Sequence, residues 1–339
     1  MRIFVTGGAG YIGTTLVSFL LKNGHDVTVL DRFFFGKEAL EKSHGLGNLS
    51  LLRDDIRWFD GRLLEGFDAV VDMAALSNDP SGELDPWKTL EINYLGRSRV
   101  ARMAKQAGIK RYLLISSCSI YGFQDGLLTE ESKPNPLTTY AKANLLAERD
   151  NLPLSDGDFA STAVRFATIY GLSGRMRFDL AINGMVLGAI QKGKIPVMRD
   201  GSQWRPFLYV GDAARAVLKI LESDPSKVNG QIFNIGSDSQ NYTIKSLADL
   251  VASSLTHTPS VEWYGDPDTR SYKVSFAKAR SVLGFETETT PDVAAREIEA
   301  AILNSQIPDM MKTNTLGWYK HIRENKQASD EVALRGVVL

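Results

Sequence analysis

The feature that most constrains the fold is a glycine-rich segment near the N-terminus, TGGAGYIG at 6–13. It follows a short β-branched and aromatic run, RIFVT at 2–6, and leads into a helical pattern at 12–22 with apolar residues at turn spacing. Glycines permit a tight turn and let a pyrophosphate approach the amide groups of a helix N-terminus. The glycines of this G-x-x-G-x-x-G spacing are Gly7, Gly10 and Gly13. A strand, a glycine turn and a helix in this order predict a dinucleotide-binding βαβ unit.

An acidic residue follows at the distance that such a unit requires. Asp31 ends the second strand-like run, DVTVLD at 26–31, and comes 18 residues after Gly13. A carboxylate at this place can accept hydrogen bonds from both hydroxyls of the adenosine ribose and repels a 2′-phosphate, which favours NAD over NADP. The neighbouring Arg32 could instead pair with such a phosphate, so NADP stays an alternative.

Strand-like and helical segments alternate over about the first 165 residues. Further strand-like runs lie at 49–54, 69–75, 111–116 and 161–166, with helical stretches notably at 86–107 and 139–150. This alternation predicts an α/β fold of the Rossmann type, in which helices wind doubly around a parallel sheet. A later helix at 211–222 and a strand at 231–236 are expected to return to the same sheet.

The same pattern suggests how the chain divides into domains. Residues 1–170 and 205–236 are predicted to form the NAD-binding Rossmann domain. A smaller, discontinuous C-terminal lobe that binds the substrate is expected from 171–204 and 237–310. The tail at 311–339 has weak periodicity, and the sequence assigns it no role.

Composition excludes several classes of function. The 339 residues carry a net charge of −1 without a run of five like charges, so no nucleic-acid or membrane partner is expected. The single cysteine, Cys118, allows no internal disulfide and fits a reducing compartment. The four histidines lie far apart, and we expect no metal site. The opening apolar run is too short for a signal peptide, so we expect a cytoplasmic protein.

Three motifs together carry a family resemblance: TGGAGYIG at 6–13, SSCSIYG at 116–122 and YAKANLLAE at 140–148. With them the chain resembles the extended short-chain dehydrogenase/reductases, and specifically the NAD-dependent sugar-nucleotide epimerase/dehydratase family. Further matching segments follow in the family's order from residue 1 to about 285, among them DMAA, EINYLG, RFATIYG and WRPFLYVGD. The resemblance implies NAD as cofactor and a nucleoside diphosphate sugar as substrate. It also implies a homodimer built from the helices at 86–107 and 139–150.

The resemblance also implies a set of cofactor-binding residues. They are Gly7, Gly10, Tyr11, Ile12, Gly13, Asp31, Arg32, Asp55, Ile56, Met73, Ala74, Ala75, Asn93, Ser116, Tyr140, Asn144 and Phe166. In this arrangement Asp55 and Ile56 bracket the adenine, and Asn93 lies beside the nicotinamide half. Without the family, Asp55 would be interpreted as an acid at a strand end and Asn93 as a residue on a helix surface.

The catalytic residues that the resemblance implies are Tyr140, Ser117 and the position of Asn144. The tyrosine is the general acid/base on a substrate hydroxyl, and the serine hydrogen-bonds the same oxygen. In the family a lysine at position 144 grips the nicotinamide ribose and lowers the tyrosine pKa; asparagine supplies no charge. A helix turns about 100° per residue, so Tyr140 and Asn144 share a face whereas Lys142 points toward solvent. Tyr140 is therefore predicted to have a higher pKa than in relatives that carry the lysine, and to work best at alkaline pH or with oxidised NAD bound.

The two residues after Ser117 bear on which of the family's reactions the chain catalyses. The 4,6-dehydratases of this family carry an acid pair there that drives elimination of water, and this chain has Cys118 and Ser119. We therefore prefer an epimerase that works through a transient keto-sugar. The alternatives are a nucleotide-sugar reductase or oxidase that exchanges NAD(P), a dehydratase, and a catalytically weak NAD-binding regulatory protein, the last suggested by Asn144.

Several residues are candidates for binding the nucleotide sugar. Arg205 and Arg270 match family arginines that bind the diphosphate and its ribose, a task suited to charge-assisted, bidentate pairing. Outside these motifs each would be interpreted as a surface arginine. The remaining candidates are Ser117, Ser119, Thr168, which stands where many relatives have asparagine, Asn183 as a substitute amide, and Arg177.

Overall fold

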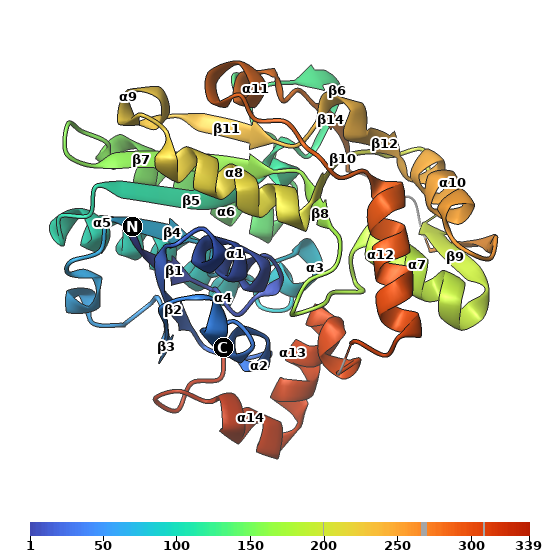
Figure 1. The fold of residues 1–339 in the computed structure, drawn as a ribbon, viewed down its shortest axis with the longest axis horizontal. Helices are drawn as coiled ribbons and strands as arrows, with labels where there is room; N and C mark the ends of the chain where they lie inside the picture. Colours follow the sequence, from blue (N-terminus) through green and yellow to red (C-terminus); the bar gives the residue numbers. More distant parts are fainter. Residues whose placement is uncertain (199, 266–269, 308) are drawn as a thin grey trace.

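The fold is built on a seven-stranded parallel sheet (Figure 1). It is seen in a computed structural model that describes residues 1–198, 200–265, 270–307 and 309–339. The strands are β1 (Arg2–Thr6), β2 (Asp26–Asp31), β3 (Leu49–Arg53), β4 (Ala69–Asp72), β5 (Arg111–Ser117), β7 (Ala160–Phe166) and β11 (Ile232–Ile235). They lie in the order β11-β7-β5-β4-β1-β2-β3. The predicted parallel, doubly wound sheet is confirmed, and β11 returns to it beside β7.

Helices cover both faces of this sheet because its strands are apolar on both faces. On one face α1 (Tyr11–Lys22) packs against α8 (Val210–Glu222), and on the other α5 (Arg97–Gln106) packs against α6 (Thr139–Asn151). Alternate residues of β1 enter the two cores: Ile3 and Val5 join the first, and Phe4 joins the second. The sheet is therefore buried between two helical layers.

The helix expected at 86–107 has an irregular middle. It consists of α4 (Pro86–Leu90), a π-helical segment (Glu91–Gly96) and α5. A π-helical segment adds a residue to the turn and so rotates the residues that follow it. Arg97 is the first residue after this segment, and it is fully buried.

Smaller sheets and helices form the part of the molecule at the right of Figure 1. One sheet joins β8 (Thr168–Tyr170), β10 (Trp204–Tyr209) and β12 (Asn241–Thr243); a second joins β9 (Lys194–Met198) and β13 (Ser260–Tyr264); a third joins β6 (Phe123–Leu128) and β14 (Ser271–Val274). The main helices here are α7 (Ala181–Lys192), α10 (Ile244–Ser254) and α12 (Pro291–Leu303). Further short helices are α2 (Glu38–Glu41), α3 (Asp79–Gly82), α9 (Pro225–Val228) and α11 (Ala277–Leu283). β10 lies in the predicted NAD-binding part, yet it pairs with β8 and β12 and not with the central sheet.

The C-terminal tail folds back toward the glycine-rich end of the sheet. Its helices α13 (Thr315–Glu324) and α14 (Lys326–Val332) lie at the bottom of Figure 1, beside and below α2. Tyr319 packs edge-on against the rings of Phe34 and Phe35. Arg53 of β3 donates hydrogen bonds to the main-chain oxygens of Glu331 and Ala333.

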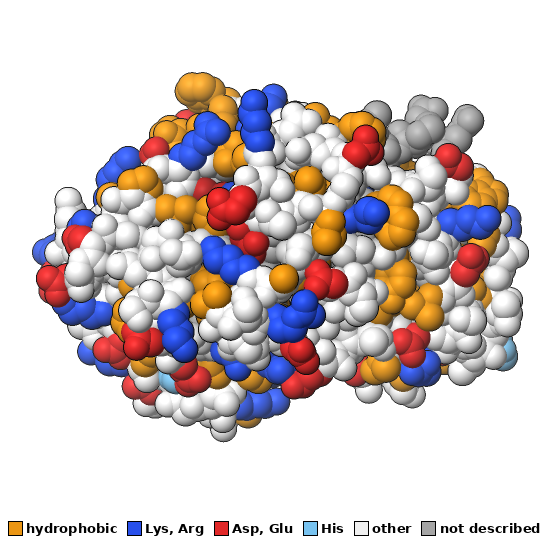
Figure 2. Space-filling model, turned by 90° about the horizontal axis from the view of Figure 1, so that it is seen from above, with side chains coloured by type: hydrophobic (Ala, Val, Ile, Leu, Met, Phe, Trp, Pro, Cys, Tyr) orange, Lys and Arg blue, Asp and Glu red, His pale blue; other side chains and the backbone are white. Residues whose placement is uncertain are grey.

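The surface shown in Figure 2 mixes basic and acidic side chains without a large area of one sign. Across the described parts of the chain, no helix combines the length and the apolar character that crossing a membrane would require.

Candidate active site

A cavity of about 680 Å³ opens at the carboxyl ends of the central strands, the usual ligand position in such sheets. The smaller sheets supply the opposite wall, with residues such as Met198 and Arg205. All the predicted cofactor-binding residues except two line this cavity: Gly7, Gly10, Tyr11, Ile12, Gly13, Asp31, Arg32, Asp55, Ile56, Met73, Ala74, Ala75, Ser116, Tyr140 and Phe166. The two exceptions are Asn93 and Asn144.

The glycine turn leaves no room for side chains. A Cβ at Gly7, where φ is +71°, would lie 2.7 Å from the Cα of Ala74, and one at Gly13 would lie 2.5 Å from the carbonyl oxygen of Gly8. The first turn of α1 contains no acidic residue, and no side chain caps it. The helix N-terminus can therefore take an anionic ligand, and the residues present fit the pyrophosphate of a dinucleotide.

Asp31 presents a fixed carboxylate at the end of β2. Its oxygens accept hydrogen bonds from the main-chain N–H groups of Ala9 (3.0 Å) and Phe33 (2.7 Å). Burial raises the pKa of Asp31, while these N–H groups act in the opposite direction. The carboxylate is thus held in place with capacity left to accept hydrogen bonds from ribose hydroxyls.

The guanidinium of Arg32 is engaged by the protein itself. Its Nη1 donates to Asp55 at 2.8 Å, and its Nη2 donates to the main-chain oxygens of Val332 (3.1 Å), Val337 (2.8 Å) and Val338 (3.0 Å). These contacts tie the tail to β2 and occupy the groups that a 2′-phosphate would need. The site therefore fits NAD better than NADP.

Asn93 supports the cavity from behind. Its side chain is fully buried and bonds both the N–H (2.8 Å) and the carbonyl (3.0 Å) of Leu76, in the loop that follows β4. It holds that loop and does not line the cavity.

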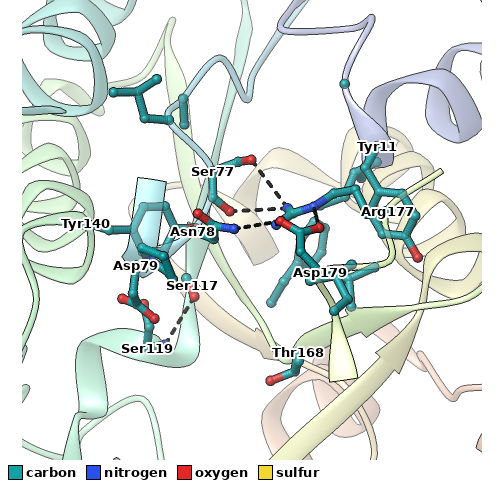
Figure 3. A pocket seen from close by; sticks show the side chains of 18 of the residues that line it. Tyr11, Ser77, Asn78, Asp79, Ser117, Ser119, Tyr140, Thr168, Arg177 and Asp179 are labelled. Atoms are coloured by element: carbon teal, nitrogen blue, oxygen red, sulfur yellow. Dashed lines mark hydrogen bonds and ion pairs between the residues drawn. The ribbon is translucent and has the colours of Figure 1, made fainter. Parts of the chain in front are cut away.

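Tyr140, Ser117 and Ser119 meet in the cavity, on the side that faces Arg177 and Tyr11 (Figure 3). Tyr140 stands in the first turn of α6, which Thr138 caps by accepting a hydrogen bond from the N–H of Ala141. The Oγ of Ser117, at the end of β5, accepts the N–H of Ser119 at 3.1 Å. The Oγ of Ser119 is buried and finds no hydrogen-bond partner among the described residues. It is therefore available to a ligand in the cavity.

Opposing influences act on the Tyr140 hydroxyl. Burial raises the pKa of Tyr140, and so does the charge of Asp79, whereas Asn144, Arg97 and Ser117 lower it; the net pKa is raised. Asp79 belongs to α3, forms an ion pair with Arg270 and accepts a hydrogen bond from Thr138.

Asn144 lies behind Tyr140, 1% exposed, and does not line the cavity. Its Nδ2 donates to the main-chain oxygen of Tyr140 (3.1 Å), and its Oδ1 accepts from Nη1 of Arg97 (2.9 Å). Arg97 does line the cavity. Lys142 is exposed, as predicted.

The predicted substrate residues divide into two groups. Ser117, Ser119, Thr168, Arg177, Arg205 and Arg270 line the cavity. Asn183 does not: it is fully buried, accepts the N–H of Gly171 (3.0 Å) and donates to Tyr11 Oη (3.1 Å) and to the carbonyl of Arg177 (2.8 Å). It therefore positions other residues of the site.

Contacts within the protein hold two of the arginines, one through an ion pair and one through main-chain oxygens. Arg177 pairs with Asp179 through two bonds of 2.9 Å, and Asn78 bonds the same carboxylate at 3.0 Å (Figure 3). Arg205 donates to the main-chain oxygens of Trp204 (2.8 Å) and Arg270. The cavity thus contains cations already fixed in orientation, which suits binding of a phosphorylated ligand.

Sequence reasoning missed some residues that line the cavity, among them Asp79, Arg97, Arg175 and Tyr319. Arg175 bonds Thr315 of the tail at 3.0 Å, and its guanidinium lies 3.6 Å from the ring centroid of Phe35. Burial lowers the pKa of Arg175 to about 9. The aromatic run DRFFFG at 31–36 was the only signal of this cluster, because its rings receive the tail.

Comparison with known proteins agrees with this geometry. The model of the NAD dependent epimerase/dehydratase family matches residues 3–236, and the chain belongs to this family of enzymes. NAD is its cofactor.

Particular relatives extend the likeness beyond the family model. UDP-glucuronic acid decarboxylase 6 of Arabidopsis thaliana is 30% identical over 312 residues, which cover 88% of this chain and 86% of the relative. UDP-glucuronic acid decarboxylase 4 of the same plant is 29% identical over 309 residues, and the match covers 88% of this chain and 66% of the relative, so the chain spans about two thirds of its length. Among solved structures, MoeE5 in complex with UDP-glucuronic acid and NAD superposes with a TM-score of 0.80 at 27% identity, covering 90% of this chain and 100% of that one.

Proposed function

We propose that the protein is an NAD-dependent nucleotide-sugar epimerase that works through a transient keto-sugar. The observation that carries the proposal is the meeting of Tyr140 and Ser117 with the cofactor-binding residues in one cavity. Positions 118 and 119, where an eliminating enzyme of the family has acids, hold a buried thiol and a hydroxyl. Burial raises the pKa of Cys118, so this thiol is no proton donor to a leaving group.

In the proposed reaction the ionised Tyr140 removes the proton of a sugar hydroxyl, while Ser117 hydrogen-bonds the same oxygen. NAD, when bound by the residues at the glycine turn and Asp31, would supply the hydride acceptor for this oxidation and the hydride donor for the reduction of the opposite face of the keto-sugar. The Oγ of Ser119 offers a further hydrogen bond to the sugar, since it has no partner among the described residues. Arg205 and Arg270 bind the diphosphate, and Tyr140 finally returns the proton.

The experiment is a panel of nucleotide sugars, including UDP-glucose and UDP-glucuronic acid, incubated with the purified protein and followed by NMR. The proposal expects new sugar stereochemistry without net formation of NADH, and loss of this product in Tyr140→Phe. Stoichiometric change in NADH absorbance would instead show a net reductase or oxidase. NAD binding without turnover across the panel would favour a regulatory protein.

Decarboxylation is a second candidate, favoured by the names of the relatives. It begins with the same oxidation, because a ketone beside the carbon that bears a carboxylate makes loss of CO2 facile. Release of CO2 from UDP-glucuronic acid would identify this reaction. Retention of the carboxylate with an inverted hydroxyl would identify the epimerase.

We also propose that the protein forms a homodimer and acts in the cytoplasm. The helical surface that would form the interface exposes large apolar side chains, with Trp87 68% and Leu95 53% exposed. Sedimentation should show a dimer, and the double variant Trp87→Glu/Leu95→Glu should show a monomer. A monomeric unmodified protein would refute this part of the proposal.

A further inference from the structure

A fully buried arginine lies directly behind the proposed catalytic tyrosine. Arg97 is 1% exposed, and its Nη2 donates to the main-chain oxygens of Asp72 (2.9 Å) and Ile115, while its Nη1 donates to Asn144 (2.9 Å). It follows the π-helical segment Glu91–Gly96, which sets the direction of the residues that begin α5. The sequence alone gives this residue no function, yet it lines the cavity.

The charge of Arg97 is not consumed in a direct hydrogen bond to an acid. Among the residues that the structure describes, the carboxylate paired with Arg97 is that of Asp72, with 4.0 Å between Nε of Arg97 and Oδ1 of Asp72. The oxygens of Asp72 accept instead from the hydroxyls of Thr6 and Tyr112, both at 2.6 Å. The acceptors that Arg97 contacts directly are neutral oxygens, and Asp72 at 4.0 Å offsets part of its charge. Burial raises the pKa of Asp72, which favours its neutral form and leaves Arg97 a net positive field at the cavity wall.

The side chain of Asn144 links this arginine to Tyr140. Its Oδ1 receives the guanidinium, and its Nδ2 donates to the main chain of Tyr140 at 3.1 Å. A lysine at 144 would place an ammonium against the guanidinium in a buried site, where like charges repel strongly. An asparagine at this position is therefore what a cation at position 97 requires.

We propose that Arg97 supplies, from α5, the positive charge that position 144 lacks, and that Asn144 orients it toward Tyr140 and the nicotinamide-ribose end of the cavity. Arg97 acts as a positioning and charge-supplying residue. The proposal rests on the proposed function in taking Tyr140 as the acid/base, but its effect on the ionisation of Tyr140 is measurable without turnover.

The charged groups that face Tyr140 come from two elements. Asp79 of α3 raises the pKa of Tyr140 and is itself paired with Arg270. Arg97 of α5 lowers it, as do hydrogen bonds from Asn144 and Ser117. Removing the arginine takes away the positive charge that opposes the effect of Asp79 on the pKa of Tyr140.

The test is the titration of Tyr140 in the NAD-loaded protein, read as tyrosinate absorbance after subtraction of the same variant carrying Tyr140→Phe. Arg97→Gln should raise the pKa of Tyr140 by about one unit or more, since an opposite charge within reach shifts a pKa by roughly 1–3 units. Arg97→Lys should keep most of the charge effect. The matched control is Arg102→Gln, because Arg102 also joins α5 to α6, through Asp150, but at the surface; it should leave the titration unchanged.

A second variant keeps the test decisive if Arg97→Gln does not fold. Asn144→Asp is nearly isosteric and puts a negative charge against Arg97, so it should also raise the pKa of Tyr140. A titration unchanged within about 0.3 units in every Arg97 or Asn144 variant that folds would overturn the proposal, because one charge change in this site should exceed that.

A double-mutant cycle at positions 97 and 144 tests the proposal independently, with the melting temperature and the activity as its readouts. Asn144→Lys alone should lower the melting temperature and give no gain in activity, because it buries a second cation beside Arg97. In the Arg97→Thr background the same change should raise the melting temperature, so the sign of its effect reverses. An activity gain and an unchanged melting temperature for Asn144→Lys alone would overturn the proposal. If the nucleotide-sugar panel fails while the Tyr140 titration shifts as expected, the proposed function fails and the role of Arg97 stands.

Discussion

The buried ion pair that fixes α6 to the sheet provides the sharpest stability prediction. Glu148 and Arg165 are 2% and 3% exposed, and Arg165 donates to the carboxylate from Nη2 at 2.7 Å and from Nε at 3.1 and 3.2 Å. Ser116, in the cofactor wall, donates to the same carboxylate. Glu148→Gln keeps the size of the side chain but leaves the guanidinium as a buried, unbalanced cation. Such a change costs about 3–5 kcal/mol.

The expected loss lies near the low end, about 3 kcal/mol, because Arg165 keeps the hydroxyl of Tyr121 (2.9 Å) and the carbonyl of Glu130 (3.4 Å) as acceptors. That is a large share of the 5–15 kcal/mol by which typical domains are stable. Urea unfolding, followed by circular dichroism and by intrinsic fluorescence, measures it as a lower midpoint with an unchanged slope.

The matched control is Asp150→Asn. Asp150 lies on α6, like Glu148, and its ion-pair partner is Arg102 of α5. That pair is 3.2 Å long and largely exposed, so its loss should cost less than about 1 kcal/mol. If Glu148→Gln cost no more than Asp150→Asn, the buried pair would not hold α6, and the reasoning from burial would be refuted.

Other predictions concern the site itself. Tyr140→Phe should reduce turnover by about 10²–10⁴-fold while NAD stays bound to the purified protein; undiminished NMR-detected turnover would exclude Tyr140 as acid/base. Because the pKa of Tyr140 is raised, its base form is lost as pH falls, so the rate should rise from neutral into alkaline pH; a flat pH–rate profile would contradict this. Asp31→Ser should weaken NAD binding in fluorescence titrations without creating a preference for NADP, because Arg32 remains bound to Asp55 and the tail; tight NADPH binding would show otherwise. Cys118, buried and with a raised pKa, should resist iodoacetamide in the folded protein, and rapid alkylation seen by mass spectrometry would show an open site.

The central fold could be predicted because its signals are local. The second strand was expected at 26–31 and lies at Asp26–Asp31, because its β-branched residues favour a strand. The glycine turn was equally readable, because its spacing reflects contacts within a few residues. The strands of the smaller sheets were harder to predict: β8 and β12 have three residues each, too few for a periodic pattern.

Site residues could be predicted where they belong to a sequence motif. They were missed where their position in the site depends on the packing of helices far apart in the sequence. Arg97 sits in a polar stretch, RSRVARMAKQ, that is typical of an exposed helix. Its burial depends on the contact of α5 with α6, and its partner Asn144 is 47 residues away. Asn93 was predicted to lie beside the nicotinamide half and Asn183 to contact the substrate, but their amides bond the main chain behind the cavity, a difference that no spacing rule encodes.

The buried face of α6 carries polar side chains whose burial costs free energy, and their contacts explain why they are there. Three polar residues follow one another at turn spacing: Tyr140, Asn144 and Glu148. Residues four apart share one face, and two of these three are almost completely buried. Each of those two receives a buried guanidinium, Asn144 from α5 and Glu148 from β7. Apolar residues would pack there at lower cost, since buried polar groups must be fully satisfied to be tolerated. Two fixed bonds on successive turns leave α6 little freedom to rotate or slide. These bonds fix the backbone at Tyr140, one turn toward the N-terminus, whose hydroxyl interacts with Ser117. Arg97, which we propose as the source of the positive charge near this hydroxyl, is held by Asn144 of the same helix face.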